Sequence, residues 1–97
     1  MLEKLVGIEQ RYDELEQLIS DPEVMMDYTK VVEYSKERSS LSESVEQYKI
    51  YKQQIQQLAE AKQMLDEESD PEINAMAKEE VVSLTASTEA LKEKLIF

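Results

Sequence analysis

The sequence lacks cysteine and histidine and has one glycine and two prolines among 97 residues. The absence of cysteine excludes disulfides, thiolate nucleophiles and zinc–thiolate sites, and it favours a reducing compartment, the cytoplasm. Without histidine, most sites of general acid–base catalysis at neutral pH are excluded. No apolar stretch approaches the roughly 20 residues that cross a bilayer. We therefore expect a cytoplasmic binding module with no catalytic centre and no cofactor.

Acidic residues outnumber basic ones, with 22 Asp and Glu against 11 Lys and Arg and a formal charge of −11. Such a chain repels a bare phosphate backbone unless its lysines lie together on one face. In this sequence the lysines are not clustered on one face. Glu67, Glu68 and Asp70 fall in a polar loop, where water prevents the pKa shifts that a catalytic carboxylate pair needs. The loop also lacks the alternating ligands and the glycine of a calcium loop, so we expect no metal site.

Two segments with the same four residues punctuate the chain, Ser20-Asp21-Pro22-Glu23 and Ser69-Asp70-Pro71-Glu72. A residue before proline is held outside the α region, so Asp21 and Asp70 are predicted to cap helices that begin at the prolines. A capping box that starts at each serine is the alternative. Before the first segment, apolar residues at spacings of three and four predict a helix over about residues 2–19.

Between the two segments, an uninterrupted pattern predicts one helix over about residues 28–67, which would be about 60 Å long. Its apolar face consists of Val31, Tyr34, Leu41, Val45, Tyr48, Tyr51, Ile55, Leu58, Ala61 and Leu65. A helix of this length needs a partner. A third pattern, over about residues 71–96, supplies one, because its apolar positions step by fours and threes as in a coiled-coil seam. These positions are Ala77, Val81, Leu84, Thr88, Leu91 and Leu95.

The predicted fold class is therefore all-α, in a single domain that spans residues 1–97. It is a long antiparallel helical hairpin, coiled-coil-like, with the additional N-terminal helix packed at its base. The hairpin tip is the short polar stretch of residues 66–71.

The turn before the long helix is predicted to be covered. We expect the N-terminal helix and this turn to shield Tyr28, Val31, Val32 and Tyr34. We also expect Met25 and Met26 to fill gaps in a small satellite core. A methionine patch that binds a ligand is the alternative. Tyr34 and Tyr48 lie on the apolar face of the long helix, which favours packing over stacking on RNA bases. A drift in the heptad phase leaves open whether Tyr51 or Lys52 faces the partner helix.

The order of these segments resembles the amino-terminal domain of bacterial peptide chain release factors, the class I release factor family. The anchors are LISDPEV and SDPEINAMAKEE, with YSKERSSL in the long helix between them, and the similarity spans essentially all of the chain. The release factor 1 type, which reads UAA and UAG, is the more similar. The release factor 2 type usually has a tryptophan after its first Asp-Pro-like turn, where this chain has Val24, Met25 and Met26.

The resemblance implies that the chain is one domain of a longer multidomain factor. The family's codon-reading tripeptide and Gly-Gly-Gln loop do not occur in these residues, so no catalytic residue is carried over. It also implies docking on the ribosome, near the stalk base of the large subunit, while other domains of the same factor read the codon and trigger peptide release. An acidic arm can contact basic ribosomal protein surfaces by charge complementarity. The candidate partner contact is the tip, Glu67, Glu68 and Asp70.

A self-associating coiled-coil scaffold or adaptor is the alternative function. Docking predicts a mainly monomeric chain, because its own hairpin covers the seam of the last helix. A scaffold instead pairs that seam between chains.

Overall fold

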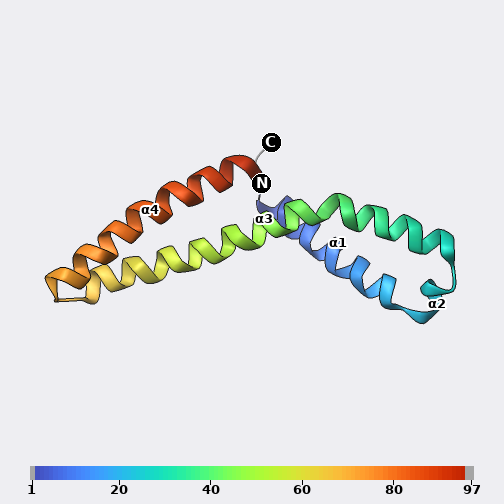
Figure 1. Cartoon of the computed structure of the whole chain (residues 1–97), viewed down its shortest axis with the longest axis horizontal. Helices are drawn as coiled ribbons and strands as arrows, with labels where there is room; N and C mark the ends of the chain where they lie inside the picture. Colours follow the sequence, from blue (N-terminus) through green and yellow to red (C-terminus); the bar gives the residue numbers. More distant parts are fainter. Residues whose placement is uncertain (1, 96–97) are drawn as a thin grey trace. The chain divides into compact units, whose positions relative to one another are not determined.

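The computed structural model describes residues 2–95, which form helices joined by short turns (Figure 1). The helices are α1 (Leu2–Ser20), α2 (Pro22–Met25), α3 (Tyr28–Glu67) and α4 (Pro71–Leu95). No strand occurs within residues 2–95, and the all-α prediction is confirmed. The predicted end of the last helix, Ile96, and the side chain of Leu2 lie outside the part that is described.

The aspartate before each proline caps the helix that follows it, Asp21 for α2 and Asp70 for α4. Asp21 is extended, with φ −71° and ψ 124°, and its carboxylate accepts a hydrogen bond of 2.9 Å from the N–H of Glu23. The carboxylate of Asp70 accepts an equivalent bond, also 2.9 Å, from the N–H two residues on. The Ser20 hydroxyl donates back into α1, to a carbonyl oxygen four residues earlier, so the alternative capping box does not form there. The aspartate caps are the form of cap that proline at the first helical position favours.

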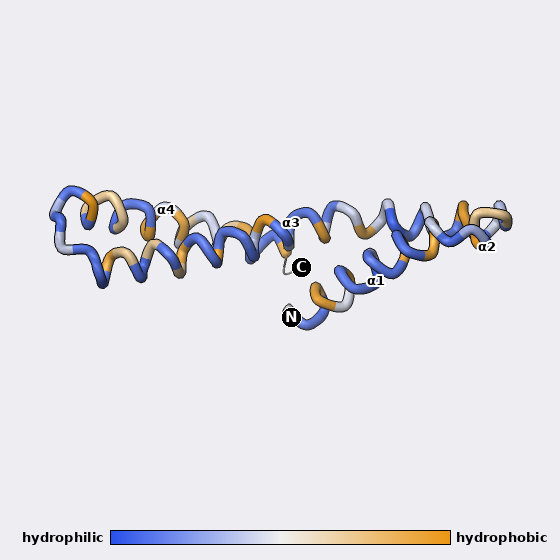
Figure 2. The backbone as a smooth tube through the Cα atoms, turned by 90° about the horizontal axis from the view of Figure 1, so that it is seen from below, coloured by the Kyte–Doolittle hydropathy of each residue, from blue (hydrophilic) through white to orange (hydrophobic). Residues whose placement is uncertain are grey.

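The chain divides into two compact units, unit 1 (Met1–Tyr48) and unit 2 (Lys49–Phe97). In unit 1, α1 lies antiparallel to the first part of α3, with α2 in the connection (Figures 1 and 2). Its buried apolar side chains are Leu5, Leu15, Val24, Val45 and Tyr48, and Leu15 has no exposed surface at all. The hydrophobic core of this unit is therefore a single thin layer between two helices.

In unit 2, the second part of α3 and α4 form the predicted antiparallel hairpin (Figure 2). The predicted seam of α4 faces inward, because Ala77 and Thr88 are buried and the leucine and valine positions between and after them are half-buried. Polar contacts of side chains also join the two helices. The Asn74 amide donates to the Leu65 carbonyl at 2.9 Å, and the Ser87 hydroxyl donates to the Gln54 side-chain oxygen at 2.6 Å.

The inner face of α3 in unit 2 differs from the prediction at one position. Tyr51 is buried and Lys52 is exposed, which decides the alternative that the heptad phase left open. The prediction that Ile55 faces inward is wrong, since it is 41% exposed and Gln54 takes the inner position. With Gln54 in this position, the inward residues step by three and four from Tyr51 to Ala61. The hydrogen bond from the Ser87 hydroxyl satisfies the side-chain oxygen of Gln54, which this register turns toward α4.

The turn between α1 and α3 also corrects the sequence analysis. Met25, Met26 and Tyr28 are exposed rather than packed in a satellite core. The physical reason is the length of α2, which has four residues and buries only Val24. One turn of helix directs one side chain inward, and its neighbours then point to solvent.

Candidate functional site

The α3–α4 turn brings the three predicted contact residues together and gives each a different role. Glu67 is the last residue of α3, and the Glu68 N–H closes its final turn by donating to the Met64 carbonyl at 2.9 Å. The Glu68 carboxylate accepts hydrogen bonds from two loop N–H groups, those of Ser69 at 3.1 Å and Asp70 at 3.0 Å. Glu68 and Asp70 therefore hold the turn as well as carrying charge.

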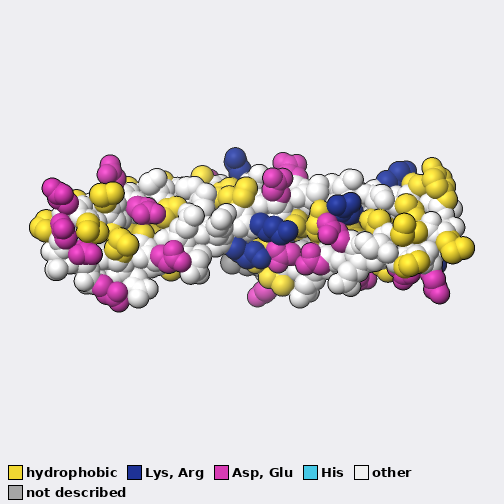
Figure 3. All heavy atoms as spheres, turned by 60° about the horizontal axis from the view of Figure 1, so that its bottom comes forward, with side chains coloured by type: hydrophobic (Ala, Val, Ile, Leu, Met, Phe, Trp, Pro, Cys, Tyr) yellow, Lys and Arg dark blue, Asp and Glu magenta, His cyan; other side chains and the backbone are white. Residues whose placement is uncertain are grey.

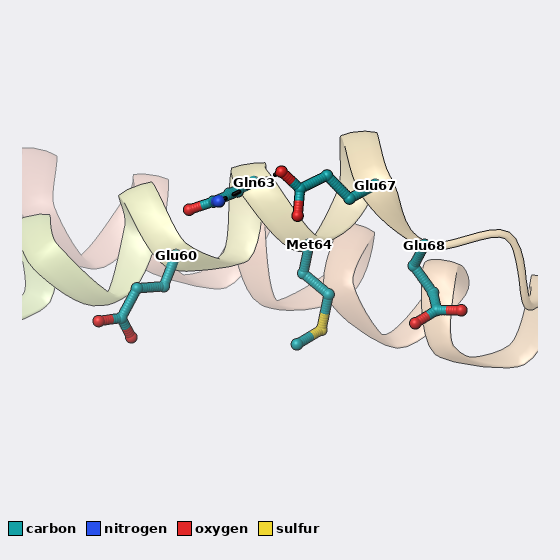
Figure 4. Close-up of a pocket in the computed structure, with 5 residues that line it drawn as sticks. All are labelled: Glu60, Gln63, Met64, Glu67 and Glu68. Atoms are coloured by element: carbon teal, nitrogen blue, oxygen red, sulfur yellow. Dashed lines mark hydrogen bonds between the residues drawn. The ribbon is translucent and has the colours of Figure 1, made fainter.

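The outer surface of this turn is a shallow groove of about 420 Å³ along the end of α3, lined by Glu60, Gln63, Met64, Glu67 and Glu68. Figure 4 shows Glu60, Met64 and Glu68 projecting from the same side of the helix, with the thioether between two carboxylates. Their spacing of four residues places them in one row. Gln63 lies apart from this row and donates to Glu67 at 3.2 Å.

The charge of the α3–α4 turn is of one sign. Residues 63–77 contain five carboxylates and no lysine or arginine, and Lys62 and Lys78 are the nearest basic residues on either side in the sequence. The acidic residues of the stretch are all exposed except Glu68, which is partly buried. Uncompensated carboxylates on a protruding turn create a negative potential that attracts a basic partner.

Sequence reasoning missed three members of the groove, Glu60, Gln63 and Met64. The signal was present, because Glu60, Met64 and Glu68 recur at intervals of four in a helix whose apolar face lies elsewhere. The Glu60 carboxylate accepts a hydrogen bond of 3.2 Å from Gln56, one helical turn earlier. Met64 is 49% exposed, which places an apolar group at the centre of the acidic surface.

The arginines of unit 1 are engaged within the fold. Arg11 donates to both carboxylate oxygens of Glu37, at 2.7 and 2.9 Å, and to Glu14 at 2.8 Å. The hydrogen bonds and charge of Arg11 lower the pKa of Glu37. Arg38 lies 3.3 Å from a carboxylate oxygen of Glu16 and 5.7 Å from the centre of a tyrosine ring. These bidentate and stacked contacts join α1 to α3.

Tyr48 and Tyr51 of α3 do not form a platform for nucleic-acid bases. Tyr48 and Tyr51 are 7% and 9% exposed, so their ring faces are covered. Base stacking requires an open aromatic face beside basic groups.

The described residues also hold no group of three or more His, Cys, Asp or Glu side chains that could bind a metal ion. Within residues 2–95, no helix has the length and apolar character of a membrane span.

The chain is similar to known proteins over nearly its whole length. The PCRF domain family matches residues 8–97. Peptide chain release factor 1 of Bacillus subtilis (strain 168) is 48% identical over 95 residues, which cover 98% of this chain and 27% of that protein. Peptide chain release factor 1 of Geobacillus sp. (strain WCH70) is 50% identical over the same share of this chain and 26% of its own length. The chain thus spans about a quarter of these relatives. No solved structure matches it.

Proposed function

Because the chain belongs to the PCRF domain family, we propose that it is the ribosome-docking domain of a translation termination factor of the release factor 1 type. The observation that carries this proposal is the identity of 48% over 98% of the chain. The proposed partner surface is the stalk base of the large ribosomal subunit, as the resemblance implies. The proposed setting is the cytoplasm, and the factor directs release at UAA and UAG through its other domains.

The proposed division of labour assigns no chemistry to this chain. The Gly-Gly-Gln loop that acts at the ester bond of peptidyl-tRNA in this family does not occur in the sequence. The domain contributes affinity and association rate instead, which a charged, protruding turn can supply by electrostatic steering. It requires no cofactor.

The α3–α4 turn is the proposed contact, with Glu67, Glu68 and Asp70 facing a basic stalk-base surface. Its support is the run of five carboxylates without a basic residue over residues 63–77. The turn is held by its own hydrogen bonds, so its charges are presented on a fixed backbone. A preorganised charged surface steers a partner without an ordering cost at the moment of binding.

The structure dictates which charges to reverse in a test. Lysine at Glu68 or Asp70 would remove hydrogen bonds that hold the turn, so a slower association could reflect local unfolding. Glu60 and Glu67 each accept only an exposed bond from a glutamine one turn earlier. Glu60→Lys with Glu67→Lys therefore changes the charge of the tip and leaves the turn in place.

The test uses a chimeric factor, in which this chain replaces the matching 95 residues of B. subtilis release factor 1. Stopped-flow binding to termination complexes at two ionic strengths should give an association rate about tenfold lower for the reversed factor at low salt. The difference should shrink at high salt. The matched control reverses two exposed charges on α4, Glu79→Lys with Glu80→Lys. Equal rates for the two variants at both salts would eliminate the tip as the steering contact.

We propose that the isolated chain is monomeric. The support is the seam of α4, which packs against α3 within unit 2 and leaves Ala77 and Thr88 2% and 6% exposed. A scaffold that paired this seam between chains would have to open the hairpin first. Sedimentation velocity tests the point, and a dimer at micromolar concentration would favour the scaffold.

A further inference from the structure

The turn between α1 and α3 exposes three large apolar side chains within four residues. Met25 is 61% exposed, Met26 89% and Tyr28 81%. Figure 3 shows hydrophobic side chains gathered over α2 and the start of α3, at the right of the view. Single exposed apolar residues are ordinary on a protein surface, whereas a contiguous group marks a surface that another molecule covers.

The fold does not need these side chains. The turn is anchored by buried Val24 and by two capping carboxylates, that of Asp21 on α2 and that of Asp27, which accepts from the Lys30 N–H at 3.3 Å. The α3–α4 turn leads into α4 through the same Ser-Asp-Pro-Glu segment, and its loop, residues 68–70, contains no methionine. The exposed residues can therefore be replaced with little effect on folding.

The exposed side chains continue into a groove on α3. A hollow of about 390 Å³ is lined by Val31, Val32, Ser35, Lys36 and Ser39. Tyr28 precedes the two valines by three and four residues, so it lies on the same side of the helix, one turn before them. We call Met25, Met26, Tyr28 and this groove the α2 surface.

The charge beside the α2 surface selects the partner. The residues that flank Met25 and Met26 are acidic, because residues 21–27 include Asp21, Glu23 and Asp27 and no lysine or arginine. Lys30 and Lys36 follow, and Glu33 between them is acidic, so the charge of residues 20–36 is −2, from Asp21, Glu23, Asp27 and Glu33 against the two lysines. Nucleic acid is disfavoured by this charge. Flexible methionines with an acidic surround suit an apolar face that carries basic side chains at its edge.

We propose that the α2 surface is a second docking site, and that its partner is a basic amphipathic segment of another protein. The apolar face of the segment covers Met25, Met26 and Tyr28, and its lysines or arginines lie near Glu23. The site is separate from the α3–α4 turn, because it belongs to unit 1 and shares no residue with that turn.

The test is site-specific photocrosslinking of the chimeric factor in living B. subtilis cells. Benzoylphenylalanine replaces Met26 or, in the matched control, Val82, which is 66% exposed on α4. The expected result is a crosslink from position 26, absent from position 82, to one protein segment in which basic and apolar residues alternate. Three results would each overturn the proposal. They are crosslinks to RNA alone, crosslinks to other copies of the factor alone, and a crosslinking yield at position 26 no higher than at position 82.

A binding measurement makes the result quantitative. A synthetic peptide of the crosslinked segment should bind the chimeric factor with a Kd about tenfold higher when Met25 and Met26 are both replaced by serine. Glu23→Lys should weaken binding at low salt and have less effect at high salt. An unchanged Kd in the double serine variant would contradict the proposed site. The identity of the captured protein, ribosomal or not, tests the proposed function. The α2 surface is tested separately, by whether the captured segment combines basic and apolar residues.

Discussion

Leu15 is the side chain on which the packing of unit 1 depends most directly. It lies on α1, and none of its surface is exposed. Leu15→Ala removes three buried carbon groups, at about 0.8 kcal/mol each, and leaves a cavity that adds to this cost. A thin layer between two helices can partly collapse around the gap, so we expect a total loss of about 2–4 kcal/mol. A domain of this size has on the order of 5–15 kcal/mol of stability in all.

Urea unfolding followed by far-ultraviolet circular dichroism measures this loss. With a slope of about 1.3 kcal/mol per molar urea, the midpoint should fall by about 1.5–3 M. Met26→Ala is the matched control, because that side chain is 89% exposed, and it should change the stability by less than about 0.5 kcal/mol. A loss below about 1 kcal/mol for Leu15→Ala would refute the assignment of this residue to the core.

Three further predictions concern the seam, the ion pair and the chemistry. Leu84→Ala and Leu91→Ala should each cost about 1–3 kcal/mol, since both side chains are half-buried in the hairpin of unit 2. Arg11 and Glu37 should show a favourable coupling in a double-mutant cycle at neutral pH. Because the folded state lowers the pKa of Glu37, this stabilisation is present above the unfolded pKa of about 4.3 and disappears as the pH falls through the folded value. The isolated chain should hydrolyse no peptidyl-tRNA on ribosomes that carry a stop codon.

A different result would contradict each of these three predictions. Losses below about 0.5 kcal/mol at both leucines would mean that the seam of α4 faces solvent. A coupling between Arg11 and Glu37 that is unchanged in acid would show that the interaction does not depend on the ionised carboxylate. Release above background by the chain alone would require a catalytic group in a sequence without histidine or cysteine.

The fold could be predicted where the sequence carries local signals of known geometry. Proline fixes the start of a helix and forces the preceding aspartate into the cap, which is why the turns at Asp21 and Asp70 were foreseen. The seam of α4 was predictable because its apolar residues keep a single heptad phase from Ala77 to Leu95.

The position of Ile55 could not be obtained in the same way. Apolar character favoured Ile55 for the inner face of α3, but the register that buries Tyr51 and Ala61 places Gln54 there. The choice depends on the Ser87 hydroxyl, 33 residues away, which satisfies the amide. A hydrogen bond between distant residues leaves no trace in local periodicity.

In the candidate sites, too, the sequence predicted the features that depend on local signals and not those that depend on side-chain contacts. Glu67, Glu68 and Asp70 were placed correctly at a turn, because polar residues before an Asp-Pro cap identify one. Their different roles were not predictable, since Glu68 bonds the loop through its side-chain conformation. The exposure of Met25 and Met26 was missed because helical periodicity carries no information across a turn of two residues.

The central claim is that this chain gives a termination factor its ribosome-docking domain. The most direct measurement compares the association rates with termination complexes of two factors, the chimera and B. subtilis release factor 1 without the matching segment. We predict that the chimera associates about tenfold faster or more, with the advantage reduced at high salt and with the same preference for UAA and UAG. Equal association rates for the two factors at low salt would contradict the claim.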